Sequence, residues 1–383
     1  MIINYGSHYL DNNDIKSVIK QLKSPNITQG NTIEKFEEAL KKKLKAKYCV
    51  TTSSGTGSLH LISLSYNWKK GDIIFTTPNS FVATSNCILY SGATPVFIDI
   101  CKKSYNIDTK KLEKKLKSYK KNQRKNLKAV IATDFAGNPN NWKKLKEISL
   151  KYNVKLINDN CHALGASYYG SNYAVKYADC INLSFHAVKN ITTGEGGAIL
   201  TNDYSVYKKA KLLRTHGIDK SNNKKEIWFY DMKKLGFNYR ITDIQCALGL
   251  SQLKKLKKFI SKRRQIARIY DKAFSNDERF IIPPINEKSK HAYHLYPLQI
   301  KFEKLKIKKK DFFKRLLRNK IKLQVHYIPI HFHSYYKKKF GYKIGSFPIT
   351  ESFYKREVSL PIYFSLSLKQ VRKIIQLIKN FAK

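Results

Sequence analysis

Short apolar runs alternate with helical patterns between residues 30 and 215. Runs such as 72–76 (DIIFT), 127–133 (LKAVIAT) and 154–159 (VKLIND) have the length and composition of buried strands. Further strands are predicted at 95–100, 180–185 and 197–202, and helices at 33–46, 53–67, 79–92 and 141–152. Strands separated by helices form βαβ units, so the pattern predicts a mostly parallel sheet covered on both faces.

The pattern changes after Thr242. Residues 242–274 form one long helical pattern, and beyond Phe280 strands and helices mix with proline turns such as IIPPINE and YIPIHF. We therefore expect a large α/β domain over residues 1–245, in which the segment 1–30 contributes to the site. A connector helix and a small α+β domain are expected over residues 246–383.

The chain carries 74 Lys and Arg against 27 Asp and Glu, a formal net charge of +47. A charge of this size is compatible with binding to nucleic acid, because basic surfaces neutralise phosphates. The excess, however, is mostly lysine, and it is spread over stretches such as 41–47, 110–121 and 306–310, where lysine alternates with inward-facing apolar residues. This spread favours a lysine-rich enzyme surface without a specific nucleic-acid partner, and a basic nucleic-acid-binding protein remains the alternative from another class.

The cysteines and the apolar content bear on the compartment. The six cysteines are scattered without a CxxC spacing, which is typical of a protein that keeps its thiols reduced. No apolar run is long enough to cross a bilayer, and the first residues lack a secretory pattern. We expect a cytoplasmic protein with no membrane segment, no disulfide framework and no metal site.

Four polar segments fall where a parallel sheet places its ligands, beyond the carboxyl ends of the strands. They are SSGTGS at 53–58, Asp159, SFHAVK at 184–189 with the following TGEGG at 193–197, and GFNYRITD at 236–243. Each alone also fits a structural role, as a helix cap, a turn residue or a lysine with a solvent-exposed head. Burial would lower the pKa of the Lys189 amine and make it a nucleophile.

Together these segments resemble the DegT/DnrJ/EryC1/StrS nucleotide-sugar aminotransferases, in order and over essentially the whole chain. The resemblance rests on Ser-Gly-Thr at 54–56, Asp159 with HALG at 162–165, the two motifs around Lys189, and Asn-Tyr-Arg at 238–240. Within the family, the chain is most similar to members of pseudaminic acid synthesis, on the stretches ITQG (27–30), TTPNSFVATSNCIL (76–89), SFHAVKNITTGEGGA (184–198), ALGLSQLKK (247–255), HLYPL (294–298), QVHYIPI (324–330) and SLP (359–361).

The resemblance implies a fold-type I transferase that depends on pyridoxal 5'-phosphate and works as a homodimer with shared active sites. Lys189 would bind the cofactor as a Schiff base and transfer protons, and Asp159 would pair with the ring nitrogen. Phe81 would stack on the ring, and His162 would lie near its 3-oxygen. The phosphate would be held by Gly55, Thr56, Ser184 and Asn238 of the partner subunit.

The resemblance also implies the reaction. The amino group of L-glutamate would move to C4 of a UDP-4-keto-6-deoxy-N-acetylhexosamine, and a C3- or C4-aminotransferase for a TDP- or GDP-linked ketosugar is the alternative within the class. Lys189 argues against the dehydratase branch of the family, which carries His at this position. The implied sugar-nucleotide contacts are Tyr5, Asn26, Ile27, Thr28, Ser54, Gln324, Val325, His326, Tyr327 and Arg240 of the partner subunit.

The chain departs from the family pattern at a few positions. Gly57 stands where Ser or Ala is commoner, and Ser53 where Asn is usual. Asn160-Cys161 replaces a small pair, and Asp134 occupies a position where many relatives carry His. None of these positions is expected to carry the reaction itself, and the departures leave the fine placement of the substrate open.

Overall fold

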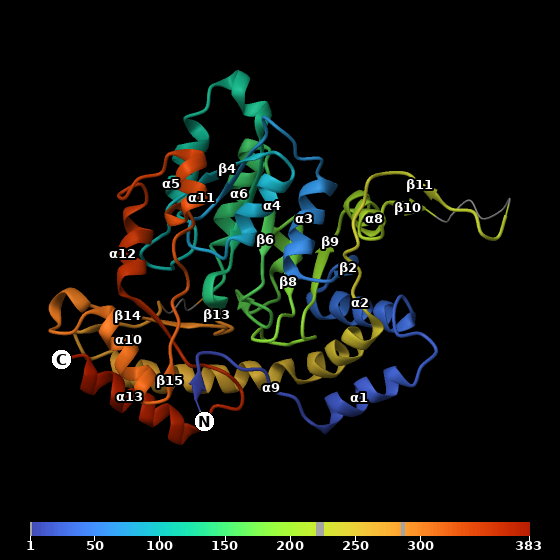
Figure 1. Ribbon diagram of the computed structural model, residues 1–383. Helices are drawn as coiled ribbons and strands as arrows, with labels where there is room; N and C mark the ends of the chain where they lie inside the picture. Colours follow the sequence, from blue (N-terminus) through green and yellow to red (C-terminus); the bar gives the residue numbers. More distant parts are fainter. Residues whose placement is uncertain (1, 220–225, 285–287) are drawn as a thin grey trace.

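The computed structural model describes residues 2–219, 226–284 and 288–383 (Figure 1). Its central sheet has seven strands in the order β2-β9-β8-β6-β5-β3-β4. β4, β3, β5, β6 and β8 are parallel, while β9 is antiparallel to both of its neighbours, so the mostly parallel sheet is confirmed. The strands are β2 Tyr48–Thr52, β3 Ile73–Thr76, β4 Thr94–Phe97, β5 Leu127–Thr133, β6 Lys155–Asp159, β8 Cys180–Ser184 and β9 Gly197–Thr201.

Helices cover both faces of this sheet because successive strand residues point to opposite sides. In β3, Ile74 packs in the core formed with α3, α4 and α8, whereas Phe75 packs against α5 and α6 on the other face. Near β8 and β9 that second face is covered by α2 and by the long helix α9. These helices are α2 Asn31–Leu44, α3 Gly55–Ser65, α4 Ala83–Tyr90, α5 Thr109–Lys117, α6 Trp142–Tyr152, α7 Ala174–Tyr177, α8 Tyr204–Leu213 and α9 Asp243–Phe274.

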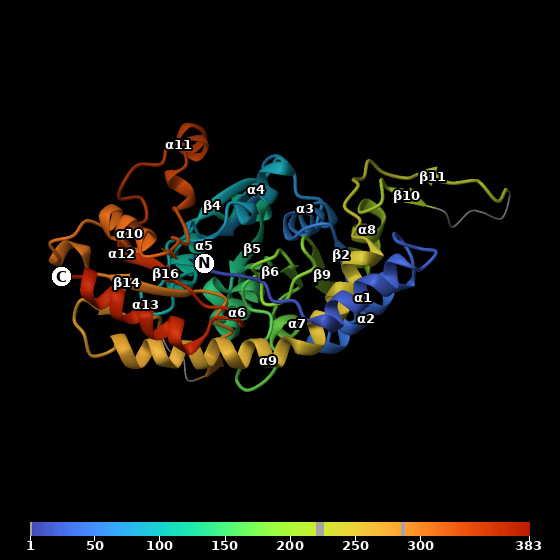
Figure 2. The same cartoon turned by 60° about the horizontal axis from the view of Figure 1, so that its bottom comes forward.

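The predicted long helix is α9, which runs along the base of the molecule in both views (Figures 1 and 2). Its first half packs on α2 and on α1 (Asn12–Leu22), and its second half enters the core of the C-terminal part. We retain the division at residues 245/246 as a proposal. This boundary falls in the first turn of α9, so the helix belongs to both cores.

The C-terminal part is built on a three-stranded antiparallel sheet, β12-β14-β16. The N-terminal strand β1 reaches this part of the molecule and pairs with β15. This pairing brings the residues that follow β1 close to the C-terminal part. The elements are β12 Phe280–Ile281, β14 Tyr296–Ile300, β15 Ile321–Lys322, β16 Glu357–Leu360, α10 Lys309–Arg318, α11 Ser334–Phe340, α12 Pro348–Arg356, α13 Leu368–Phe381 and β1 Ile3–Asn4. Two short pairs lie outside the main sheets, β7 Ser167–Tyr168 with β13 Ser289–Lys290 and β10 Ile218–Asp219 with β11 Asp231–Met232.

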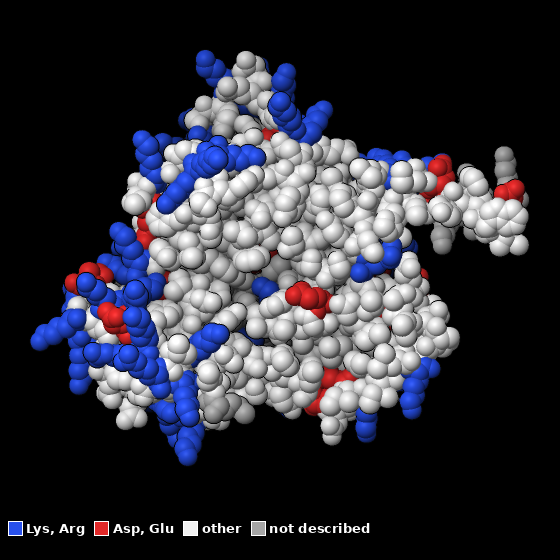
Figure 3. Space-filling view, in the orientation of Figure 1, with Lys and Arg blue, Asp and Glu red and all other residues white. Residues whose placement is uncertain are grey.

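The charge is unevenly distributed over the surface. On the face shown in Figure 3, Lys and Arg side chains gather over the C-terminal part near α10 and α13, while the middle of this face carries few charged residues. No helix among the described residues is long and apolar enough to span a bilayer.

Candidate active site

Asp159 is the last residue of β6 and is almost completely buried at the carboxyl end of the sheet. The hydroxyl of Thr84 donates to its Oδ2 at 2.7 Å, and the side-chain amide of Asn182 donates to its Oδ1 at 3.1 Å. These donors come from α4 and β8. They fix the carboxylate in one orientation and satisfy its charge in a buried position.

Lys189 lies in the turn that follows β8, where its backbone N–H donates to the carbonyl of His186 at 2.9 Å. The residue is partly exposed, yet burial of its amine lowers the pKa of Lys189, and the nearby Cys161, Asp159 and Glu195 oppose that shift. A lowered pKa increases the neutral fraction of the amine, which is the nucleophilic form. The structure therefore places an activated lysine within electrostatic range of the Asp159 carboxylate.

The loop at the start of α3 lies directly on the ends of β8 and β9. Ser54 caps this helix, its hydroxyl accepting the N–H of Gly57 at 3.0 Å. A Cβ added to Gly55 would stand 2.9 Å from the Cβ of Ser184, and one added to Gly197 would stand 2.5 Å from the carbonyl oxygen of Ser54. Only glycine allows this approach, and the partly exposed Thr56 follows Gly55 in the first turn. The N-terminus of a helix, with its backbone N–H groups beside partly exposed serine and threonine side chains, fits the phosphate of pyridoxal phosphate.

His162 follows Asp159 and is buried beneath Tyr327. Its Nδ1 accepts the N–H of Ala136 at 3.3 Å, so the ring proton is on Nε2, which donates to the Tyr327 hydroxyl at 3.0 Å. Burial, together with the charge of Lys189, holds the pKa of His162 well below its usual value. The imidazole is therefore neutral, in a single tautomer.

The predicted sugar contacts of the C-terminal part lie around His326. The ring of Tyr5 stands 4.9 Å from the ring of His326, and the ring of Phe81 stands 6.0 Å from that of Tyr327. Phe81 is 56% exposed, as a residue that covers a flat ligand would be. Gln324, which precedes these residues, pairs with Ser359 and lies next to the partly exposed Val325.

A second group of predicted contacts lies at the start of α9. The carbonyl of Ile27 accepts the N–H of Asp243 at 3.1 Å, and Thr28 forms a bridge with Thr242, which follows Arg240 by two residues. Neither Asn238 nor Arg240 uses its side chain in a hydrogen bond or an ion pair to any residue that the structure describes. These two side chains and the exposed Asn26 to Thr28 are thus available to a ligand or to another chain.

Two departures from the family pattern compensate for each other. The side-chain amide of Asn160 donates to Asp134 Oδ2 at 3.1 Å, and the Tyr173 hydroxyl donates to the same oxygen at 2.6 Å. Asp134 is fully buried, and burial raises the pKa of its carboxyl to about 6. A further departure, the glycine at position 57, has a steric reason, because a Cβ there would lie 3.3 Å from the Tyr239 ring.

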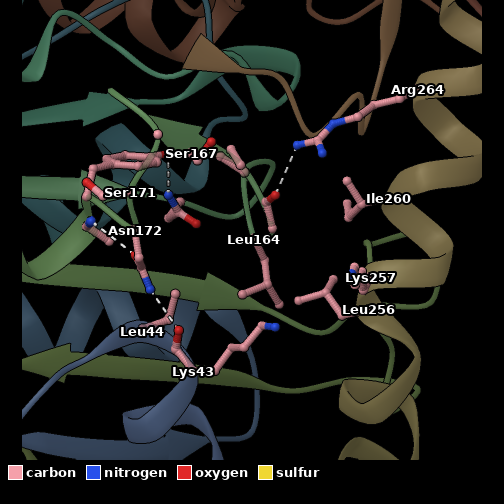
Figure 4. A pocket seen from close by; sticks show the side chains of 17 residues that line it. Lys43, Leu44, Leu164, Ser167, Ser171, Asn172, Leu256, Lys257, Ile260 and Arg264 are labelled. Carbon is pink, nitrogen blue, oxygen red and sulfur yellow. Dashed lines mark hydrogen bonds between the residues drawn. The ribbon is translucent and has the colours of Figure 1, made fainter. Parts of the chain in front are cut away.

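A separate cavity of about 270 Å³ lies between α9, the end of α2 and the loop 163–174 (Figure 4). Arg264 donates to the carbonyl of Gly165 at its edge, and Asn172 donates to the carbonyl of Lys43. Its lining includes neither Lys189 nor Asp159. The cavity is therefore distinct from the site at the carboxyl ends of the strands.

The sequence analysis assigned no role to Thr84 and Asn182, which hold the Asp159 carboxylate. Thr84 belongs to the stretch 76–89 that carried part of the family resemblance, and Asn182 is a polar residue inside an apolar strand. A buried Asn in the middle of such a strand needs a hydrogen-bond partner, and this was the available signal.

A protein-family model described as the DegT/DnrJ/EryC1/StrS aminotransferase family matches residues 8–379. A UDP-4-amino-4,6-dideoxy-N-acetyl-beta-L-altrosamine transaminase from Campylobacter jejuni is 40% identical over 97% of this chain and 95% of its own length. The structure of Helicobacter pylori PseC, an aminotransferase of pseudoaminic acid biosynthesis, superposes with a TM-score of 0.90 at 35% identity, covering 100% of this chain and 99% of that one. A sugar aminotransferase from Streptococcus pneumoniae in its PLP form also gives a TM-score of 0.90, at 26% identity and with 100% and 99% coverage. The chain belongs to the DegT/DnrJ/EryC1/StrS family and is a pyridoxal-phosphate-dependent sugar aminotransferase.

Proposed function

We propose that this enzyme moves the amino group of L-glutamate to C4 of a UDP-4-keto-6-deoxy-N-acetylhexosamine, for pseudaminic acid-type sugar synthesis. Glutamate leaves as 2-oxoglutarate, whose keto oxygen comes from water, and the oxygen of the sugar ketone is released as water, so the exchange is balanced without an oxidant. The full-length identity of 40% to a transaminase of a UDP-linked 4-amino-4,6-dideoxy sugar carries this proposal. The likeness to PseC, from the same class of pathway, supports it.

We assign the cofactor to the residues at the carboxyl ends of β6 and β8. When bound, pyridoxal phosphate supplies a ring that withdraws electrons from the carbon bearing the amino group. Asp159 would hold the ring nitrogen protonated, because its carboxylate is buried and fixed by Thr84 and Asn182. Gly55, Thr56 and Ser184 would hold the phosphate. Phe81 would cover one face of the ring. His162 would lie beside the 3-oxygen and would act on it only through its hydrogen bond with the Tyr327 hydroxyl.

Lys189 would carry out the proton transfer. Its lowered pKa lets the amine take a proton from the amino-bearing carbon of glutamate and return one to the sugar C4. The same amine holds the cofactor covalently between turnovers. Tyr5, His326 and Tyr327 line the adjacent surface, where the sugar would be oriented.

An activity panel tests the substrate. We expect glutamate-dependent formation of an amino sugar from the UDP-linked 4-keto-6-deoxy-N-acetylhexosamine, with kcat/KM at least about tenfold higher than for TDP- or GDP-linked ketosugars, because a mismatched base leaves polar groups of the site unpaired. The product is identified by mass and by its C4 amine in NMR spectra. A TDP- or GDP-linked ketosugar as the best substrate would contradict the proposal and favour the alternative within the class.

We further propose that two copies of this chain share their active sites. The paired strands β10 and β11 and the described residues next to them project away from the rest of the chain (Figures 1 and 2) and expose Ile227, Trp228 and Leu235 at 91%, 76% and 80%. Such a projecting apolar segment is stable when a second chain covers it. It leads directly to Asn238, whose exposed side chain is unpaired among the described residues. A two-fold dimer would place this segment of each copy at the cofactor site of the other.

Mixing two inactive variants tests this sharing. Lys189→Ala and the double variant Asn238→Ala with Arg240→Ala should each be inactive, and refolding them together should restore roughly a quarter of wild-type activity. About half of the randomly paired dimers are mixed, and each mixed dimer has one intact site. Activity is measured per refolded dimer.

A second mixture serves as the control. Lys189→Ala with Asp159→Asn should recover nothing above the Asp159→Asn background, because both residues act within one chain. If the first mixture also stays inactive while mixed dimers form, the 238–240 segment acts within its own subunit. The chemistry assigned to Lys189 would then be unaffected.

A further inference from the structure

A buried carboxylate and a serine hydroxyl on β16 contact His326. Ser359 Oγ donates to Glu357 Oε1 at 2.5 Å and lies 2.8 Å from His326 Nδ1. The second oxygen of Glu357 accepts the backbone N–H of His326 at 3.0 Å. Glu357 and Ser359 are completely buried, and neither belongs to the residues assigned to the cofactor or the sugar.

Counting hydrogens fixes the protonation of the ring. A serine hydroxyl has one proton, and when Glu357 is ionised, that of Ser359 is directed at its carboxylate. The Ser359 oxygen can then only accept from His326, so the ring proton is on Nδ1. Burial, with the charge of Lys189, lowers the pKa of His326 to about 3, so the ring is neutral and Nε2 keeps its lone pair.

The free nitrogen of this ring faces the site. Nε2 of His326 takes no hydrogen bond from any described residue, and unlike the unpaired polar atoms of the interior it is accessible to solvent. The ring itself packs between Tyr5 and Tyr327, with both ring-centre distances 4.9 Å. Nε2 is therefore an acceptor open to solvent on the surface where Tyr5 and Tyr327 lie, within electrostatic range of Lys189.

We propose that Glu357 and Ser359 are positioning residues that hold His326 as the Nδ1–H tautomer, so that its Nε2 accepts a hydrogen bond from a hydroxyl of the ketosugar. The sugar part of this inference rests on the proposed function, whereas the tautomer is a property of the free protein. An acceptor at this place selects a substrate that presents a donor there, because an analogue lacking the donor leaves Nε2 unpaired.

The charge of Glu357 is required for this arrangement. Burial raises the pKa of Glu357, and the neighbouring Lys309 opposes that shift. The Lys309 amine also donates to the carbonyl of Tyr354 at 2.7 Å. Above this raised pKa of about 7, Glu357 is ionised and can only accept, and this forces the Ser359 proton toward it.

The isosteric variant Glu357→Gln tests the tautomer. The oxygen of the new amide would accept the backbone N–H of His326, and its nitrogen would donate to Ser359. The Ser359 hydroxyl would then donate to His326 Nδ1, and the ring proton would move to Nε2. Nitrogen NMR of the holoenzyme labelled at the histidine rings, with His326→Gln for assignment, should show protonated Nδ1 in the wild type and protonated Nε2 in the variant. A wild-type ring protonated on Nε2, or an unchanged tautomer in the variant, would overturn the proposal.

Steady-state kinetics test the contact with the sugar. In Glu357→Gln the ring presents a donor to a substrate donor, so kcat/KM for the ketosugar should fall roughly tenfold to a hundredfold. The value for glutamate should stay near wild type, because that half-reaction does not involve the sugar. Ser359→Ala removes the hydroxyl that selects either tautomer of the His326 ring. Its kcat/KM for the ketosugar should lie between those of the wild type and Glu357→Gln.

Glu351→Gln is the matched control. Glu351 is a buried carboxylate of the same part of the chain, and its Oε1 lies 3.0 Å from His331 Nε2. This variant should leave the His326 signals and the ketosugar kcat/KM unchanged. Equal losses for glutamate and ketosugar in Glu357→Gln would overturn the sugar contact. If the wild type turned over no ketosugar at all, the proposed function would fail, and the NMR result would still decide the tautomer.

Discussion

Replacing Lys189 with alanine should abolish turnover and the covalent retention of pyridoxal phosphate. The amine has a pKa lowered by burial and lies within electrostatic range of Asp159. Its loss removes both the covalent anchor of the cofactor and the group that moves the proton, two effects that together exceed any single electrostatic contact. We expect the wild type to be yellow, and borohydride to attach the cofactor to a peptide containing Lys189.

Lys255→Ala is the control for loss of a partly buried lysine. Lys255 forms ion pairs with Asp11 and Asp14 at the junction of α1 and α9, away from the sheet ends. This variant should remain yellow and active, with a lower unfolding temperature. Labelling of another lysine by borohydride, or a Lys189→Ala variant that still turns over, would show that the nucleophile is a different residue.

Much of the fold follows from local pattern. The apolar runs 127–133 and 154–159 became β5 and β6 within a residue at each end, because a strand buried on both faces has to be apolar throughout. The direction of β9 did not follow in the same way. Its sequence is as apolar as that of β8, and strand direction depends on the connection between the two, which turns through the loop holding Lys189.

The candidate site also contains residues whose place follows from local sequence and residues whose role depends on long-range contacts. The position of Asp159, Gly55 and Ser184 at the carboxyl end of the sheet could be predicted, because each lies at the end of a strand or the start of a helix, where sequence position determines place in the sheet. The roles of Glu357 and Ser359 could not, because they depend on contacts with His326, which lies 31 and 33 residues away in the sequence. The bond between Asn160 and Asp134 is another long-range contact, and only the structure shows that one departure supports the other.

Replacing Asp159 with asparagine should lower turnover at least about a hundredfold, the scale of removing a key electrostatic partner in an active site. Asparagine keeps the shape and can still accept from Thr84, but it has no charge to hold the cofactor ring nitrogen protonated. Without that proton the ring is a weaker acceptor of electrons. The expected result is a low kcat for both half-reactions, measured in single turnovers with glutamate and with the ketosugar, at an unfolding temperature close to that of the wild type.

Asp134→Asn separates this electrostatic role from the general cost of losing a buried carboxylate. Asp134 lies just beyond β5, next to β6 in the sheet, and accepts from Asn140, Trp142, Asn160 and Tyr173. Removing its charge breaks a hydrogen-bond network without reaching the cofactor, so stability should fall by about 1–3 kcal/mol while turnover is retained. If instead Asp159→Asn lost stability and kept near-normal turnover, Asp159 would be a structural residue like Asp134. Opposite behaviour of the two variants is the result that the different surroundings of these carboxylates lead us to expect.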